Sequence, residues 1–497
     1  MDSLSLPLRK YFGWDHFKDG QESVIEAILD GQDALAVLPT GGGKSLCYQL
    51  PALIKQGLVV VISPLVALME DQVRKLQNRS IPAICIHSGL DLKKRLEAKK
   101  MMLEDDLRLL YLAPERLQSP FIQNFIKQKA ITGKIVALAV DEAHCISAWG
   151  HNFRPLYRKI GEIRKICLDV PVVALSATAA PRVRADIIKY LNLKWPILKV
   201  CSARRSNLNY QIRKRSKNTL HEVLEALRNT RGASLIYSQT RKSVEKWSEL
   251  LRANGIPAIP YHAGLDAQLR EKALNSFLKE SQPVLVATVA FGMGVDRSDV
   301  GLVLHLNLPS SPESYLQESG RAGRDGLSAD CLILFSSRDR TRLRWVMESS
   351  ERSKIQTRNF VENLGIENNS QEQLRRMEAI AEGALCIEQS LLFSIGEFSK
   401  PCGRCDRCLN SSSKQNWSSE ASKLLENVDQ KKGAETFALV QKLVQQFGNN
   451  QEFWSWLARR LVQEELLEES DNGTQMLFIK DTGLIFLSKP WPLCYSF

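Results

Sequence analysis

The first 340 residues alternate short β-branched runs with helix-length amphipathic segments. Parallel strands need a long crossover connection, usually a helix, so this alternation predicts α/β units built on parallel sheets. Ten runs are strand candidates, and they form two sets of five divided near residues 193–205. We therefore expect two similar α/β units with a cleft between them. The candidates are Leu35–Leu38, Leu58–Ile62, Arg108–Leu112, Ile135–Val140 and Val172–Leu175, then Ser234–Tyr237, Ala258–Tyr261, Val284–Ala287, Leu302–His305 and Cys331–Phe335.

The strand pattern ends after about Arg340. Residues 341–400 carry good helix formers and are predicted to be helical. Residues 410–416 form a polar linker. Beyond it, two short apolar runs at 476–480 and 484–487 are predicted to pair as strands.

A helix is also predicted over Phe453–Leu461 in this C-terminal part. It carries Trp454 and Trp456, and an aromatic pair on a helix more often packs into a core than wedges into DNA. We expect these two side chains to be buried.

The composition is that of a soluble globular protein, with 44% hydrophobic and 25% charged residues among 497. Lys and Arg number 67 against 55 acidic residues, a net charge of +12. Such a surplus suits a polyanionic partner, because basic contacts to phosphates release counterions, although many basic proteins bind no nucleic acid. The longest apolar runs are far shorter than a membrane span, and no signal peptide is evident. We expect a cytoplasmic protein without a membrane partner.

Pro39–Ser45 is a glycine-rich loop between a predicted strand and a helix that opens at Leu46. Glycines let backbone N–H groups turn onto phosphates, and the helix N-terminus favours the negative charge. Lys44 would reach the terminal phosphates and Ser45 would ligate Mg²⁺. Leu38 stands where a full phosphate-loop pattern has its first glycine, so the loop alone could also be an ordinary turn. The expected nucleotide-binding residues of the loop are Thr40, Gly41, Gly42, Gly43, Lys44 and Ser45.

Asp141 and Glu142 follow an apolar strand at the carboxyl edge of the predicted sheet, where nucleotides bind. Asp141 would hold Mg²⁺, and Glu142 would act as general base toward the attacking water. Such a pair is usually a solvated strand end, but beside a Gly-Lys-Ser loop it predicts ATP hydrolysis.

Two arginines, Arg321 and Arg324, lie on a glycine-rich turn within Gln317–Gly326 of the second unit. From there they can point across the cleft at a γ-phosphate and neutralise charge that develops during phosphoryl transfer. An arginine supplied by a separate domain also couples closure of the cleft to the ATP state.

Together these segments resemble superfamily 2 helicases of the DEAH-box type, and more narrowly the RecQ family of DNA helicases in its short bacterial form. The resemblance covers about residues 8–410, and Asp141–Pro155 is its most specific part. The segments that carry it are Tyr11–Trp14, Phe17–Gln21, Leu38–Tyr48, Ser63–Leu65, Tyr111–Leu117, Asp141–Pro155, Ser176–Thr178, Tyr261–Gly264, Ala287–Gly294 and Gln317–Gly326.

The resemblance implies an α/β fold with two RecA-like parallel-sheet domains in tandem. A helical zinc-binding subdomain and a short, divergent winged-helix-like C-terminus would follow. The expected boundaries are 1–199, 200–343, 344–410 and 411–497.

The resemblance also implies ATP-driven 3′→5′ movement on single-stranded DNA and separation of tailed or forked duplexes, in recombination and repair. Trp14 and Lys18 would sandwich the adenine, and Gln21 would read its edge. His144 would relay the nucleotide state toward DNA, and Arg324 would be the arginine finger with Arg321 beside it.

The resemblance further implies DNA contacts from an aromatic-rich loop and two backbone-contacting positions. The alternative for the loop aromatics Trp149 and Phe153 is ordinary core packing, and the two further positions could be only structural. Trp and Phe offer stacking faces to bases, and Arg adds a cation. The loop residues are Trp149, His151, Phe153 and Arg154, and the backbone contacts are His262 and Thr288.

Several positions depart from the family pattern. Lys18-Asp19 replaces the usual Arg-Pro, so a weaker adenine stack is expected. Asn152 and Leu156 replace acidic residues around the aromatic loop, and Arg297 replaces a lysine. None of these changes removes a catalytic group.

Cys386, Cys402, Cys405 and Cys408 have the spacing of a metal site. Two residues between cysteines let one loop aim both sulfurs at one ion, and four thiolates favour tetrahedral Zn²⁺. An iron–sulfur cluster uses similar spacings, whereas a disulfide is disfavoured in a reducing compartment. Ile387-Glu388 stands where the family usually has two arginines. The remaining cysteines are expected to be reduced thiols: Cys47, Cys85, Cys145, Cys167, Cys201, Cys331 and Cys494.

Two other functions compete with a DNA helicase that uses ATP, Mg²⁺ and Zn²⁺. One is a translocase or RNA-directed ATPase on the same motor that does not separate strands. The other is a DNA-binding scaffold with a decayed motor, which the intact Lys44, Asp141, Glu142 and Arg324 argue against. Expected partners are DNA and single-strand-binding or other repair proteins, with the chain a monomer associated with the nucleoid.

Overall fold

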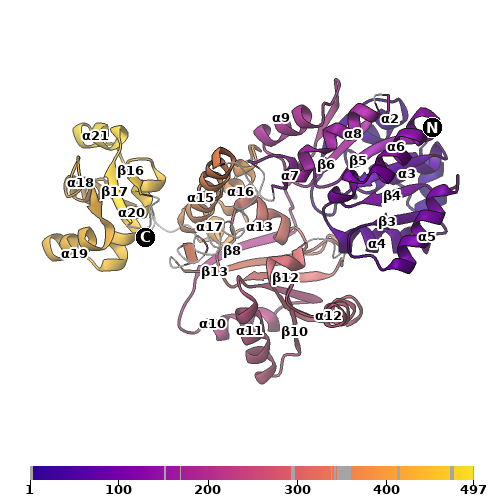
Figure 1. The fold of residues 1–497 in the computed structure, drawn as a ribbon. Helices are drawn as coiled ribbons and strands as arrows, with labels where there is room; N and C mark the ends of the chain where they lie inside the picture. Colours follow the sequence, from indigo (N-terminus) through magenta and orange to yellow (C-terminus); the bar gives the residue numbers. More distant parts are fainter. Residues whose placement is uncertain are drawn as a thin grey trace.

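The computed structural model describes residues 4–495 apart from 150–152, 168, 293–296, 337–338, 341–342, 344–359, 411–414 and 471–474. Two sheet-centred bodies lie side by side, helices α15 to α17 pack against the second of them, and a small C-terminal body lies beyond (Figure 1). No helix among the described residues is long and apolar enough to cross a membrane.

The first body is built on a seven-stranded sheet, and every strand pair in it is parallel. The strand order is β3-β4-β2-β5-β6-β1-β7. The strands are β1 (Ala34–Val37), β2 (Leu58–Ile62), β3 (Ala83–Ile86), β4 (Leu109–Leu112), β5 (Ile135–Val140), β6 (Val172–Ser176) and β7 (Ile197–Val200). Its helices are α1 (Ser5–Phe12), α2 (Gln21–Leu29), α3 (Leu46–Ile54), α4 (Val66–Gln77), α5 (Leu92–Leu103), α6 (Pro120–Ile131), α7 (Pro155–Arg158), α8 (Ile160–Ile166) and α9 (Pro181–Tyr190), with short 3₁₀ turns η1 (Pro114–Gln118) and η2 (Ala143–Ile146).

Both faces of this sheet are buried, because helices cover each of them. Side chains of one strand alternate between two separate cores: Val60 and Ile62 pack on one side, and Val59 and Val61 on the other. This double burial explains why the strands read as continuous apolar runs in the sequence.

The second body is a six-stranded, all-parallel sheet with the order β10-β11-β9-β12-β13-β8. Its strands are β8 (Leu208–Lys214), β9 (Ala233–Tyr237), β10 (Ala258–Tyr261), β11 (Val284–Ala287), β12 (Val300–His305) and β13 (Ala329–Phe335). Its helices are α10 (Thr219–Arg228), α11 (Arg241–Ala253), α12 (Ala267–Lys279) and α13 (Pro312–Ser319), with the 3₁₀ turn η3 (Val289–Gly292). The predicted pair of parallel α/β units is therefore confirmed.

The ten predicted strands are all present, but β3, β7 and β8 were missed. All three lie at sheet edges; β7 and β8 carry exposed or mixed side chains, whereas β3 is a short buried run of four residues. Ile197 and Leu198 of β7 are 38% and 51% exposed, for example. Because β7 still belongs to the first sheet, the crossing between the two bodies falls at residues 201–207, at the end of the predicted break.

Helices α15 (Phe360–Glu382), α16 (Ile387–Ser394) and α17 (Asp406–Leu409) share a hydrophobic core with the second sheet. Met377 and Ile387 lie in the same buried cluster as Tyr210 and Tyr315. This subdomain is therefore braced directly on the second body.

The C-terminal body has its own core around the fully buried Trp454, and Trp456 is buried as well, as predicted. Along the chain, its elements are a helix, a strand, two helices and two strands, followed by α21. The first six elements have the order of a winged helix. The elements are α18 (Ser418–Glu426), β15 (Ala434–Glu435), α19 (Thr436–Phe447), α20 (Gln451–Gln463), β16 (Leu467–Glu469), β17 (Met476–Ile479) and α21 (Asp481–Ser488), and β14 (Gln415–Asn416) pairs with β18 (Cys494–Tyr495).

The prediction that residues 484–487 form a strand was wrong, because they lie in α21. A four-residue apolar run cannot distinguish strand from helix by its pattern. Asp481 in the first turn suits the positive end of a helix, and only Phe486 of the run is fully buried. The strand β17 instead pairs antiparallel with β16 and β15.

Candidate nucleotide site and nucleic-acid face

The glycine-rich loop Pro39–Ser45 joins the carboxyl end of β1 to α3. Gly41 and Gly43 have φ angles of 81° and 72°, a left-handed backbone that other residues rarely adopt. A Cβ atom on Gly42 would lie 2.8 Å from the Pro39 carbonyl oxygen. The shape of this loop therefore depends on all three glycines.

Lys44 and Ser45 follow at the start of α3, as a phosphate site requires. The Lys44 ammonium lies 3.5 Å from the Leu38 carbonyl oxygen, so it is folded back over the loop. Lys44 and the loop amides are positioned to receive phosphate oxygens, and Ser45 offers a hydroxyl beside them.

Two side chains from residues 18–21 hold the phosphate loop by donating hydrogen bonds to the carbonyl oxygens of the loop. Gln21 Nε2 donates to the carbonyl oxygens of Gly42 (3.1 Å) and Gly43 (3.0 Å), and Lys18 Nζ donates to that of Gly41 (2.8 Å). The Lys18 backbone N–H in turn donates to Gln21 Oε1 at 2.8 Å, which fixes the amide orientation. Gln21 and Lys18 therefore contact the loop directly.

Trp14 lies apart from these contacts and is 46% exposed. Its ring stacks on Phe12 with 5.5 Å between centroids, and the Arg79 guanidinium lies 6.0 Å from it. Trp14 is thus partly exposed beside Phe12 and Arg79, while Lys18 is engaged by the loop. The adenine sandwich stays a prediction.

Asp141 lies at the end of β5, next to the end of β2. Asp141 Oδ2 accepts a hydrogen bond from Ser63 Oγ (3.4 Å), and Oδ1 accepts one from the Glu142 N–H (3.0 Å). Burial, and then the charge of Glu142, raise the pKa of Asp141 well above its usual range, while Lys44 opposes the shift. A buried carboxylate of this kind, with the Ser45 hydroxyl on the adjoining loop, offers the oxygen donors that Mg²⁺ takes.

Glu142 adopts a left-handed backbone with φ 48°. Its Oε2 atom is buried, accepts no hydrogen bond from the described residues, and lies 3.3 Å from His144 Nδ1. A buried acceptor of this kind is suited to take a proton from a water molecule in the cleft.

His144 connects this strand end to the one beside it. His144 Nδ1 lies 3.0 Å from Ser176 Oγ, and Ser176 Oγ donates to the Thr178 carbonyl oxygen at 2.7 Å. Burial, aided by the charges of Lys44 and Arg154, lowers the pKa of His144 to about 3, so the ring is neutral at pH 7. A neutral imidazole can exchange partners between Glu142 and Ser176 without a change of charge.

The arginine segment of the second body meets the phosphate loop of the first. A Cβ atom on Gly41 would lie 3.6 Å from Arg324 Cγ, and one on Gly320 would lie 3.0 Å from Thr40 Cβ. Arg321 is only 6% exposed. The structure therefore brings Arg324 against the loop, as predicted from the sequence, while Arg321 is buried beside Tyr237 in the second body.

The predicted aromatic loop presents Trp149 outward, because this side chain is 48% exposed. The Arg182 guanidinium lies 5.2 Å from its ring centroid, and the Arg158 guanidinium lies 4.8 Å from that of Phe153. Arg154 Nη1 donates to the Pro64 carbonyl oxygen at 3.1 Å. His151 lies outside the described residues.

His262, predicted to contact DNA, has a counterpart that sequence reasoning missed. His262 Nε2 lies 2.7 Å from Glu245 on α11, and its Nδ1 accepts the Gly264 N–H at 3.2 Å. In the first body, His87 Nε2 lies 3.2 Å from Glu70 on α4, and its Nδ1 accepts the Gly89 N–H at 3.2 Å.

Each of these histidines follows an edge strand, β3 or β10, and each lies seventeen residues after its glutamate. The signal was present as His87-Ser-Gly-Leu beside His262-Ala-Gly-Leu. Thr288 lies near the second of these turns, because its N–H donates to the Tyr261 carbonyl oxygen at 3.2 Å. The two bodies therefore present matched turns at the carboxyl ends of their sheets.

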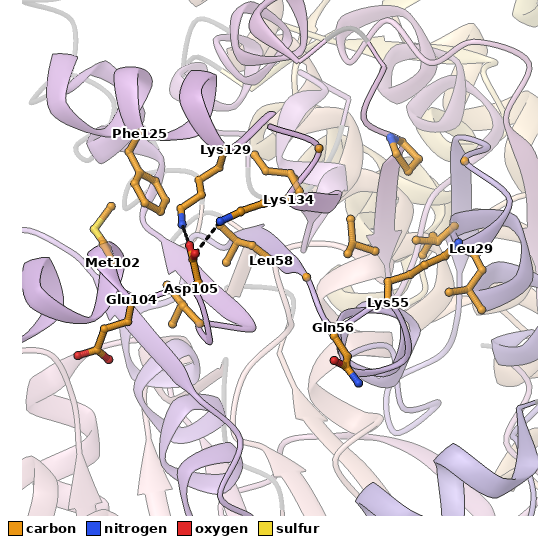
Figure 2. A pocket seen from close by; sticks show the side chains of 18 residues that line it. Leu29, Lys55, Gln56, Leu58, Met102, Glu104, Asp105, Phe125, Lys129 and Lys134 are labelled. Atoms are coloured by element: carbon orange, nitrogen blue, oxygen red, sulfur yellow. Dashed lines mark hydrogen bonds and ion pairs between the residues drawn. The ribbon is translucent and has the colours of Figure 1, made fainter. Parts of the chain in front are cut away.

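A cavity of about 410 Å³ lies at the other, amino edge of the first sheet. Lys129 and Lys134 both point at Asp105 there, at 2.9 and 2.7 Å (Figure 2). Asp105 pairs with both ammonium groups, and Glu104 and Lys55 also line this cavity. It belongs to neither the nucleotide site nor the aromatic loop.

The four predicted metal ligands converge, with all four sulfurs within 4.8 Å of one another. Backbone N–H groups point at two of them: Cys386 Sγ accepts from Cys402 (3.2 Å), and Cys402 Sγ accepts from Cys405 (3.2 Å). Such donors stabilise thiolates, and four thiolates at this spacing fit a tetrahedral Zn²⁺.

The fold and the site together define a nucleotide-binding protein with two tandem RecA-like domains of the helicase type. The DEAD/DEAH box helicase family matches residues 18–187, and the helicase conserved C-terminal domain matches residues 216–326. A solved structure of the Mycobacterium smegmatis helicase Lhr, bound to single-stranded DNA and AMP-PNP, has the same fold. Its TM-score is 0.57 at 16% identity, over 96% of this chain and 60% of that one.

Two bacterial proteins described as ATP-dependent DNA helicase RecQ are 38% identical to the chain over 423 residues. The match to the Haemophilus influenzae protein includes 85% of this chain and 66% of the relative. The match to the Bacillus subtilis protein includes 84% of this chain and 69% of the relative. The chain thus spans about two thirds of the length of these relatives. The chain belongs to the RecQ family of ATP-dependent DNA helicases.

Proposed function

We propose that the chain is a DNA-stimulated ATPase that moves 3′→5′ on single-stranded DNA and separates duplexes, in DNA recombination and repair. The observation that carries this proposal is the position of Arg324, which reaches from the second domain over Gly41 of the phosphate loop. An arginine in that position makes hydrolysis depend on closure of the cleft, and this dependence is what a motor requires. Membership of the RecQ family supports the choice of DNA.

ATP is the proposed substrate, and Mg²⁺ would be held by Ser45 and Asp141. The metal, when bound, would neutralise charge on the phosphate oxygens. Lys44 and the loop amides bind and orient the phosphates. Glu142 takes the proton from the attacking water, and Arg324, with Arg321 beside it, neutralises charge at the γ-phosphate.

DNA is proposed to cross the carboxyl ends of both sheets. The turns at His87 and His262 would each present backbone N–H groups to phosphates, one in each domain. Trp149 with Arg182 offers a stacking face and a cation at the end of the β5 segment. Lhr, which shares this fold, is itself bound to single-stranded DNA.

Zn²⁺ is proposed as a structural ion at Cys386, Cys402, Cys405 and Cys408. Four thiolates leave no open coordination position, so the ion would brace the helical subdomain and take no part in catalysis. We place the domain boundaries at 1–200, 201–343, 344–410 and 411–497, with the first moved from the expected 199 because Val200 still pairs with β1. We place the protein in the cytoplasm as a monomer on nucleoid DNA.

The decisive experiment compares ATP hydrolysis with and without single-stranded DNA, and unwinding of 3′-tailed and 5′-tailed duplexes. We expect stimulated hydrolysis and release of the 3′-tailed substrate alone. Stimulation without release would leave a translocase that does not separate strands. Hydrolysis that is indifferent to DNA would overturn the proposal.

A further inference from the structure

The segment 201–207 is the crossing between the two domains, and it is fastened on both sides. The helical subdomain holds it through Glu397, which accepts hydrogen bonds from Ser202 Oγ and from the Ala203 N–H (2.9 Å). On its other side, Arg205 reaches into the nucleotide cleft.

The Arg205 guanidinium donates to carbonyl oxygens of both domains. Its Nη1 lies 3.4 Å from the carbonyl oxygen of Thr40, in the phosphate loop, and 3.4 Å from that of Gly320. Its Nη2 donates to Ala322 (3.1 Å) and Gly323 (2.7 Å), the two residues before the arginine finger. The planar guanidinium, with five N–H donors in a fixed fork, suits such a cluster of carbonyls.

The backbone that carries Arg324 is shaped by the same segment. Gly323 has φ 55°, and Asn207 Nδ2 donates to the carbonyl oxygens of Gly323 and Leu327, each at 2.8 Å. A cavity of only about 20 Å³ remains between Arg205, Thr40 and Gly320. A displacement of Arg205 would therefore be transmitted to Arg324.

The backbone of Arg205 is in turn held by the cysteine loop. Arg404, between Cys402 and Cys405, donates from Nη2 to the Arg205 carbonyl oxygen at 2.8 Å. The same Nη2 donates to Glu388, a carboxylate that is 2% exposed. A continuous series of hydrogen bonds thus runs from the cysteine loop to the phosphate loop.

Glu388 also accepts a hydrogen bond from Arg204 Nε at 2.9 Å. One buried carboxylate therefore holds an arginine of the crossing segment and an arginine of the cysteine loop. Removing its charge would leave Arg404 without a buried counter-charge and free its side chain from Arg205.

We propose that Arg205 is a positioning residue for ATP hydrolysis, which holds the Arg324 segment against the phosphate loop and is itself held by Arg404 and Glu388. The inference rests on the proposed ATPase function and assigns a role to the helical subdomain in it. Arg205 contacts the backbone carbonyl of Thr40 in the phosphate loop and those of residues 320–323, which precede Arg324. It therefore acts on ATP through Arg324.

The first test is a double-mutant cycle with Arg205→Gln and Arg324→Ala, measured as DNA-stimulated ATP hydrolysis. We expect Arg205→Gln to lower kcat about tenfold with less than a twofold change in KM for ATP, since positioning is lost and not substrate binding. In the Arg324→Ala background, the same change should lower kcat no further, because coupled residues are non-additive. Equal effects in both backgrounds would overturn the proposal.

Arg228→Gln, on the exposed end of α10, is the matched control and should leave kcat unchanged. Arg205→Lys keeps the charge but has only three N–H donors for four carbonyl oxygens, so its kcat should fall between those of wild type and Arg205→Gln. Wild-type activity in Arg205→Lys would show that charge alone suffices. It would overturn the proposal that hydrogen bonds from Arg205 to the four carbonyl oxygens position Arg324.

Hydrogen exchange without nucleotide supplies a readout that is independent of activity. Arg205→Gln should speed amide exchange in peptides covering 38–46 and 316–328 but not in the interior strand 284–287. Glu388→Gln should give the same pattern more weakly. Unchanged exchange in the two peptides would refute the proposal that Arg205 holds the Arg324 segment against the phosphate loop. A wild-type chain that hydrolyses no ATP would refute only the proposed function.

Discussion

Arg324 of the second domain lies against Gly41 of the first, so that a Cβ atom on Gly41 would be 3.6 Å from Arg324 Cγ. The two domains therefore touch at the phosphate loop. Their contact sets the distance between the Arg324 guanidinium and a nucleotide bound to the loop. Changes in that contact should alter turnover before they alter ATP binding.

Arg324→Ala should lower kcat for DNA-stimulated hydrolysis on the order of 10³-fold, because an arginine finger stabilises charge that develops only in the transition state. ATP affinity should change little, as measured with a fluorescent nucleotide analogue. Arg324→Lys should recover part of the rate. A large loss of affinity with normal kcat would place Arg324 in substrate binding and contradict its assignment as the finger.

Lys44→Ala should abolish hydrolysis, because the phosphate loop would lose the ammonium group that reaches the terminal phosphates. Binding to single-stranded DNA, measured by fluorescence anisotropy, should be largely retained. Lys55→Ala, at the exposed end of the same helix, is the control and should hydrolyse ATP normally. Normal hydrolysis by Lys44→Ala would remove the basis for the nucleotide site.

Much of this site could be predicted from the sequence, because its parts are local. The loop Pro39–Ser45 and the pair Asp141-Glu142 are each a short segment at a strand end, and parallel strands bring their carboxyl ends to one edge. Arg205 could not be predicted in this way. Its partners are four backbone carbonyls from two distant segments, and backbone carbonyls leave no mark in a sequence.

The fold shows the same division. Interior strands such as Ile135–Val140 are buried on both faces and were found from their apolar runs, whereas the edge strands Ile197–Val200 and Leu208–Lys214 carry mixed side chains and were missed. His87 is a different case. The sequence around His87 resembles that around His262. Their partners Glu70 and Glu245, however, can be recognised only once α4 and α11 are placed beside their strands.

His87→Ala should weaken binding to single-stranded DNA by roughly three- to tenfold, as should His262→Ala, because each ring holds a turn that presents backbone N–H groups to phosphates. His221→Ala, an exposed histidine on α10, is the control. Anisotropy titrations at fixed salt decide the matter, since phosphate contacts depend on ionic strength. An effect of His262→Ala without one of His87→Ala would show that the two turns are not equivalent.

Cys405→Ser should lower the zinc content and the thermal midpoint, by about 5 °C or more, because metal binding contributes directly to folding of the cysteine loop. Prolonged chelation should have the same effect on wild type. Cys494→Ser, at an exposed cysteine, should change neither quantity. If Cys405→Ser kept one zinc per chain and an unchanged midpoint, the four cysteines would not form the site.

The C-terminal domain is joined to α15 by ion pairs between charged side chains. Arg459 on α20 makes three hydrogen bonds of 2.7–3.2 Å to Glu382, whose side chain is 3% exposed. Nearby, Arg340 pairs with Glu378 and with Glu469 of β16. Breaking one partner of a buried pair costs about 3–5 kcal/mol, because the other charge stays buried and unpaired.

Arg459→Gln should therefore release the C-terminal domain and increase the radius of gyration in small-angle scattering. Lys214→Gln is the control, because its partner Glu452 is 67% exposed and exposed pairs contribute little. If this domain guides the duplex, Arg459→Gln should lose strand separation on a 3′-tailed duplex but keep DNA-stimulated hydrolysis. Equal loss of both activities would mean that the motor itself depends on the docked domain.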